Sequence, residues 1–136
     1  MSVKISGEYL GNLRVKLTHE LSGTTLITDA PLDNEGLGSS FSPTDLVATA
    51  AGSCMLTILG IIAKRDGINL EGMKVSVVKH MNTKGTRRIS QLDIDLILPS
   101  TVDFEYRAKL ERAAYTCPVV QSLHSDVVVN LKINYN

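Results

Sequence analysis

The first third of the chain alternates apolar with polar residues in short runs, a pattern typical of half-buried β-strands. Three segments show this alternation or are rich in β-branched residues, namely Val3–Ile5, Leu13–Leu17 and Thr24–Thr28. Ser22 and Gly23 separate the last two segments and predict a hairpin turn. This part of the sequence therefore predicts an N-terminal antiparallel sheet of short strands.

A polar loop and then a long helix follow the predicted sheet. The residues from Asp33 to Ser42 are rich in Gly and Ser, and the loop is long enough to bind a ligand or contact a partner. Ser42 fits the N-cap of the helix, Pro43 its first position and Asp45 its third, which together make a capping box. Gly67 follows two cations and predicts the end of the helix.

This helix carries no charge from Leu46 to Ala63. A membrane span is one explanation, since about 18 apolar residues can cross a bilayer. Interspersed Thr, Ser and Gly residues dilute the hydrophobicity, so we expect no membrane segment. An uncharged helix must be covered on every side, and from Pro43 to Arg65 it would be about 34 Å long. One small sheet covers one side only, so the sequence predicts an obligate homodimer.

The second half predicts two strands, two helices and a last strand. The expected ranges are Met73–His80, Ile89–Leu98, Phe104–Tyr115, Pro118–Leu123 and Val127–Ile133. The first helix of this pair is amphipathic, and its apolar stripe consists of Leu110, Ala113, Ala114 and Cys117. The predicted fold class is α+β, in a single domain that spans residues 1–136.

Composition argues against several classes of function. The formal net charge is zero, and the cations do not cluster into the basic stripe of a nucleic-acid-binding protein. The chain has no Trp and few other aromatic residues, which weakens any role in base stacking. The N-terminus lacks the apolar core of a secretory signal, and no Cys/His cluster has zinc spacing. We expect a cytoplasmic protein without a metal or other cofactor and without a nucleic-acid partner.

The two cysteines, Cys54 and Cys117, are the candidate chemical groups. In a chain without an export signal, such a pair is more often reduced, catalytic or inert than a structural disulfide. Cys117 precedes Pro118 and fits the N-cap of a short helix, where the helix dipole lowers a cysteine pKa. On electrostatics alone, Cys117 would be the more acidic thiol. Burial as small core residues is the commonest fate of free cysteines, and it stays open as an alternative.

The chain resembles the OsmC/Ohr family in the run Phe41-Ser42-Pro43-Thr44-Asp45-Leu46, in Ala50-Ala51-Gly52-Ser53-Cys54-Met55, and in Cys117-Pro118 far downstream. The order of elements matches along nearly the whole chain. The resemblance implies an OsmC-like fold in an intertwined homodimer whose two active sites lie at the subunit interface. The peroxide-reducing members are thiol peroxidases that favour organic hydroperoxides. By that resemblance Cys54 is the attacking thiolate and Cys117 the resolving cysteine.

The chain departs from the peroxide-reducing members at one acidic position. Those members carry Glu directly after the proline of the motif, where this chain has Thr44. Asp45 comes one residue later, which on a helix is a rotation of about 100°, so it is better explained as a capping residue. The same members use an N-terminal arginine to hold the thiolate. The candidates here are Arg14, whose alternative is a solvated strand residue, and Arg88 at the start of a strand.

Two functions follow from these observations. The first is a cytoplasmic hydroperoxide reductase of the oxidative stress response, with Cys54 and Cys117 as catalytic residues and an unidentified dithiol as reductant. Asp45, Arg14 and Arg88 are its candidate supporting residues. The alternative is a non-enzymatic dimeric module that binds a small apolar ligand between its long helices, and Thr44 in place of Glu favours it.

Overall fold

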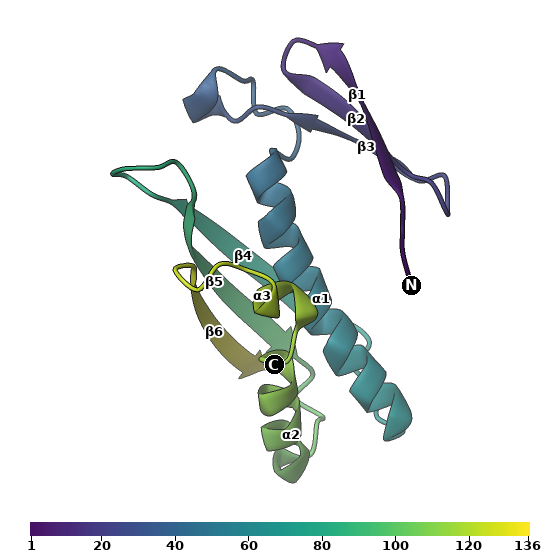
Figure 1. The fold of residues 1–136 in the computed structure, drawn as a ribbon. Coiled ribbons are helices and arrows are strands. Elements are labelled where there is room, and N and C mark those ends of the chain that lie inside the picture. The colour runs from purple at the N-terminus through teal and green to yellow at the C-terminus, as the bar shows by residue number, and fades with distance from the viewer. The chain divides into compact units, whose positions relative to one another are not determined.

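The structure, a computed structural model, describes residues 1–136 and divides into an N-terminal unit, Met1–Val47, and a C-terminal unit, Ala48–Asn136. The N-terminal unit holds an antiparallel sheet in the order β1-β2-β3 (Figure 1). Its strands are β1 (Ile5–Gly11), β2 (Arg14–His19) and β3 (Thr25–Asp29). The predicted N-terminal sheet and the α+β class are confirmed, whereas the single domain stays a prediction.

The first hairpin differs from the prediction at both of its strands. Strand β1 begins at Ile5, where the predicted first strand ended, and continues to Gly11 because it pairs with β2 along this length. Leu13 was expected in the second strand and lies in the turn instead. Asn12 and Leu13 have φ angles of 54° and 62°, the left-handed conformation that suits a two-residue hairpin. This turn places Arg14 at the first position of β2.

The loop after β3 folds back along that strand. It contains the short 3-10 helix η1 (Leu32–Asn34). The Gly38 N–H donates to the Ala30 carbonyl at 3.2 Å, and the Asp29 N–H donates to the Phe41 carbonyl at 3.0 Å. Residues far along the loop are therefore held beside the end of β3.

Helix α1 (Pro43–Arg65) has the predicted bounds, and its first residues belong to the N-terminal unit. The capping box is confirmed, because the Asp45 N–H donates to the Ser42 hydroxyl at 3.1 Å and the Ser42 N–H donates to the Asp45 carboxylate at 2.8 Å. Gly67, with a φ of 68°, follows the helix as predicted.

The C-terminal unit contains a second sheet in the order β4-β5-β6 (Figure 1). Its elements are β4 (Lys74–Met81), β5 (Ile89–Leu98), α2 (Phe104–Ala114), α3 (Pro118–Gln121) and β6 (Val128–Tyr135). Strands β4 and β5 are antiparallel, while β5 and β6 are parallel and joined by the two helices. The predicted order of elements in this half is confirmed.

The core of the C-terminal unit lies between the helices and one face of this sheet. On β5, Leu92, Ile94 and Leu96 are buried, whereas the residues between them are more exposed. Gly52 brings α1 close to β4, because a Cβ atom there would lie 2.8 Å from a methyl carbon of Val77. The close approach fixes the turn of α1 that carries the first cysteine.

Candidate functional site

The C-terminal unit brings the two cysteines together. Cys54 is partly exposed on α1, and Cys117 is fully buried. The Cys117 sulfur lies 4.0 Å from the carbonyl oxygen of Ala51, one helical turn before Cys54. The two thiols are also hydrogen-bonded to each other. A partly exposed thiol and a fully buried thiol are therefore in contact in this unit.

Cys117 reaches this place because it continues the apolar stripe of α2. Leu110, Ala113 and Ala114 are all buried in the same core. The chain then leaves α2, and Cys117 becomes the N-cap residue of α3, as its position before Pro118 predicts. The stripe and the cap together direct the sulfur toward α1.

Burial raises the pKa of the Cys117 thiol. Loss of solvent is the largest cause, followed by the hydrogen bond with Cys54, while the backbone N–H groups of Val120 and Val119 act in the opposite direction. The expectation that the helix dipole lowers the pKa of Cys117 was wrong, because desolvation outweighs the amides of a helix of only 4 residues. Cys117 therefore keeps its proton at neutral pH.

Two of the predicted supporting residues have local structural contacts. Asp45 caps α1 through Ser42, as described above. Arg88 donates from Nη1 to the carbonyl oxygen of Ile89 at 3.0 Å. The groups that shift the pKa of Cys117 are Cys54 and backbone amides, and no arginine is among them.

Arg14 lies in a cluster of the N-terminal unit that sequence reasoning missed. Its Nε is 3.9 Å from a carboxylate oxygen of Asp29, and its Nη2 donates to the Ser39 hydroxyl at 3.4 Å. Asp29 is only 1 % exposed. Its hydrogen bonds with Ser39 are the largest cause that lowers its pKa, and Arg14 adds a smaller lowering. An Asp at the end of a strand is otherwise typical of a turn, so the sequence did not indicate that Asp29 is buried and bonded to Ser39.

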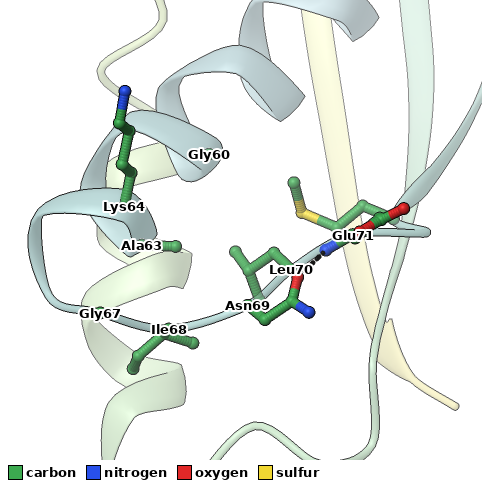
Figure 2. A pocket seen from close by; sticks show the side chains of 9 residues that line it. Gly60, Ala63, Lys64, Gly67, Ile68, Asn69, Leu70 and Glu71 are labelled. Carbon is green, nitrogen blue, oxygen red and sulfur yellow. Dashed lines mark hydrogen bonds between the residues drawn. The ribbon is translucent and has the colours of Figure 1, made fainter.

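A separate cavity of about 550 Å³ opens at the C-terminal end of α1. Its lining is mainly apolar and includes Gly60, Ala63, Ile68 and Leu70 (Figure 2). Neither cysteine lines it. The thiol pair and this cavity are therefore two distinct places in the C-terminal unit.

The family model of OsmC-like proteins matches residues 36–132, a range that includes both cysteines. The chain belongs to the OsmC-like protein family. Its resemblance to OsmC/Ohr proteins is thereby confirmed, and so is its OsmC-like fold. No protein of curated function matches this OsmC-like chain closely enough to be counted as a relative.

Solved structures of the same fold span nearly the whole OsmC-like chain. A Psychrobacter arcticus protein, described as an osmotic stress induced and detoxification response protein, shares 39% identity with a TM-score of 0.88 and covers 98% of this chain and 96% of its own. An organic hydroperoxide resistance protein from Elizabethkingia anophelis has 16% identity, a TM-score of 0.78 and coverages of 100% and 97%. Bacillus subtilis OhrB has 19% identity, a TM-score of 0.72 and coverages of 98% and 98%. The last two, at their low identity, establish likeness of fold alone.

Proposed function

We propose that this OsmC-like protein reduces organic hydroperoxides, with Cys54 as the nucleophile and Cys117 as the resolving cysteine. The observation that carries the proposal is the contact between a partly exposed thiol and a fully buried one. Two proteins of the same fold are named organic hydroperoxide resistance proteins, which supports the same class of substrate.

The reaction has two steps at sulfur. The Cys54 thiolate attacks the terminal OH oxygen of the peroxide and the O–O bond breaks, so that Cys54 becomes a sulfenic acid. The alkoxide leaves and takes a proton from water to become the alcohol. The Cys117 sulfur then attacks the Cys54 sulfur, its proton leaves with the hydroxyl group as water, and a disulfide forms. An external dithiol then reduces this disulfide by thiol–disulfide exchange, which returns both cysteines to thiols and oxidises the dithiol.

The raised pKa of Cys117 is consistent with Cys54 as the nucleophile and Cys117 as the resolving cysteine. A hydrogen bond that raises the pKa of a thiol is one that favours its protonated form. The Cys117 thiol donates toward the carbonyl oxygen of Ala51 at 4.0 Å, and its raised pKa keeps it protonated in the resting state. Only Cys54 is then available as the first nucleophile, and burial keeps the peroxide away from Cys117.

We further propose that the protein is a cytoplasmic homodimer with its sites at the subunit interface. By length and composition α1 could cross a membrane. Only 33% of its most apolar window is buried inside the chain, so most of this apolar surface needs another cover. A second subunit is the cover we propose for the remainder.

The test is peroxide consumption by purified protein with dithiothreitol, using an organic hydroperoxide and hydrogen peroxide side by side. Cys54→Ser should abolish turnover. Cys117→Ser, its matched control, should react once and leave a sulfenic acid on Cys54 that dimedone traps. Retained turnover in Cys54→Ser would refute the proposed nucleophile.

The cavity beside α1 favours a second candidate function, the binding of a small apolar ligand. Its lining lacks both cysteines, so binding there would not require thiol chemistry. Wild-type protein that turns over neither peroxide, but binds an apolar fluorescent probe with one site per chain, would favour this alternative over the peroxidase.

A further inference from the structure

Asp66 lies directly after α1 and joins the end of this helix to α2. Its Oδ2 accepts a hydrogen bond from the Tyr106 hydroxyl at 2.6 Å and another from the Lys109 ammonium group at 2.6 Å. The Asp66 N–H still donates to the Ile62 carbonyl at 3.1 Å, so the acid is fixed to the last turn of α1. We call Asp66, Tyr106 and Lys109 the Asp66 cluster. All three residues belong to the C-terminal unit.

The groups of the Asp66 cluster have the protonation states that these contacts need. The hydrogen bond from Lys109 is the largest cause that lowers the pKa of Asp66, and the Tyr106 hydroxyl adds to it. Loss of solvent, followed by the hydrogen bond with Asp66, raises the pKa of Tyr106 to about 12. At neutral pH the phenol is therefore a donor, and the carboxylate accepts from both partners.

Stability alone is a weak explanation for this cluster. The Lys109 side chain is 51% exposed and the Asp66 side chain is 33% exposed. Ion pairs of this kind contribute little to folding, because solvent screens them. Tyr106 adds direction to the contact, since its ring packs against the core while its hydroxyl reaches Asp66. The cluster is therefore better explained by what it positions.

The thiols lie at the other end of the same two helices. From Cys54 to Asp66 the chain follows α1 for about 18 Å. Tyr106 lies in the first turn of α2, whereas Cys117 follows the end of that helix. Tyr106 meets the end of α1, while Cys117 lies against Ala51 in its earlier half. The Asp66 cluster and the thiol pair therefore join the same two segments at opposite ends.

Hydrogen bonds attach Cys117 to α2, so that it follows any movement of the helix. The N–H and the hydroxyl of Thr116 both donate to the Ala113 carbonyl, at 2.9 Å and 2.6 Å. The Gln121 side chain donates to the Tyr115 carbonyl at 3.1 Å, which ties α3 to the same short link. The placement of α2 thus decides the placement of the Cys117 sulfur.

A disulfide tolerates little misplacement of its two cysteines. It needs Cα atoms within about 7 Å and suitably directed Cβ atoms. Because the Asp66 cluster is about 18 Å along α1 from the thiols, a rotation of α2 by about 10° at the cluster would move Cys117 by about 3 Å. That displacement is a large part of the range that disulfide geometry allows.

We propose that the three residues of the Asp66 cluster are positioning residues, which hold α2 on α1 in the arrangement in which Cys54 and Cys117 form their disulfide. This inference rests on the function proposed above, in which these cysteines alternate between thiols and a disulfide. The cluster touches neither sulfur, and its effect passes through the placement of α2. Its loss therefore makes the disulfide easier to reduce.

The experiment measures the equilibrium of full-length protein with dithiothreitol at neutral pH, over a series of ratios of reduced to oxidised reagent. Reduced dithiothreitol gives two electrons and two protons to the Cys54–Cys117 disulfide, which becomes two thiols, while the reagent closes into its own cyclic disulfide. Non-reducing peptide mapping quantifies the protein disulfide at each ratio.

Variants of the Asp66 cluster should destabilise this disulfide. Tyr106→Phe keeps the ring and removes the hydroxyl, and it should lower the equilibrium constant for disulfide formation by about 3–10-fold, the value of one hydrogen bond of modest net strength. Asp66→Ala removes both contacts and should lower the constant at least as much. In the Asp66→Ala background, Tyr106→Phe should have no further effect, as expected for residues that act through one contact.

Tyr135→Phe is the matched control. The Tyr135 hydroxyl donates to Glu111 of α2 at 3.3 Å, and the pKa of Tyr135 is also raised to about 12. This contact ties α2 to β6 instead of α1, so the variant should leave the disulfide equilibrium unchanged.

Thermal unfolding of the reduced proteins separates positioning from folding. A cluster that only stabilises the fold would act equally on both redox forms, so its loss would lower Tm and leave the redox equilibrium unchanged. Should Asp66→Ala fail to fold, Tyr106→Phe still removes one contact and retains the ring that packs against the core.

Four outcomes would overturn the inference. They are an unchanged equilibrium in folded Tyr106→Phe and Asp66→Ala, a more stable disulfide in either variant, an equal shift in Tyr135→Phe, and no Cys54–Cys117 disulfide in wild type at any ratio. The measurement uses no peroxide. Failure of the proposed function would appear separately, as an absence of peroxide turnover in wild-type protein whose disulfide equilibrium still responds to Tyr106→Phe.

Discussion

Gly52 is the position where the packing of α1 can be tested most directly. Adding one methyl group by Gly52→Ala would place a Cβ atom 2.8 Å from one methyl carbon of Val77 and 3.1 Å from one of Val75. Ordinary carbon contacts lie at about 3.5–4.0 Å. The helix and strand β4 must separate locally to accept the change, two residues before Cys54.

The expected free-energy change is the difference of two effects. Overpacking in a core costs about 1–3 kcal/mol, while Ala in place of Gly within a helix stabilises by about 1 kcal/mol. Gly52→Ala should therefore lose about 0–2 kcal/mol. Gly60→Ala is the matched control on the same helix, because a Cβ there meets nothing within 4 Å, and it should gain about 1 kcal/mol.

Thermal unfolding at one fixed protein concentration measures both variants. For a chain of this length, 1 kcal/mol corresponds to about 3–5 °C in Tm, so Gly52→Ala should melt about 3–15 °C below Gly60→Ala. Adding Val77→Ala to Gly52→Ala should recover part of the overpacking loss, as expected for residues in contact. Equal melting temperatures of the two Gly→Ala variants would refute the close approach of α1 to β4.

Two further predictions concern assembly and the buried thiol. Light scattering behind a sizing column should give twice the chain mass at micromolar protein, because α1 needs a cover that one chain does not supply; a folded monomer there would contradict the dimer. The pKa of Cys117 is raised in the folded state, so its contribution to stability is complete below the pKa of the unfolded thiol. That contribution is lost as pH rises toward the folded value. Wild type should therefore lose stability in alkaline urea melts more steeply than Cys117→Ala, and equal slopes would exclude this linkage.

Elements with strong local signals could be predicted from sequence to the residue. Helix α1 begins at a capping box and ends before a glycine, and both signals act within a few residues of the helix end. Strand β5 has its predicted bounds, since alternation along one strand needs no knowledge of its neighbours. The bounds predicted for strand β1 were wrong because its pairing with β2, rather than its own composition, sets its length.

The candidate site, too, could be predicted from the sequence only in part. The sequence by itself determined that Cys54 lies on an apolar helix and that Cys117 ends an apolar stripe, because periodicity is a local property. Only the tertiary structure decided that the two thiols touch and that Cys117 holds its proton, since desolvation depends on residues distant in the chain. The burial and hydrogen bonding of Asp29 could not be predicted for the same reason. Its partner Ser39 lies in a loop that returns to β3, and such a contact between distant residues produces no periodic pattern in the sequence.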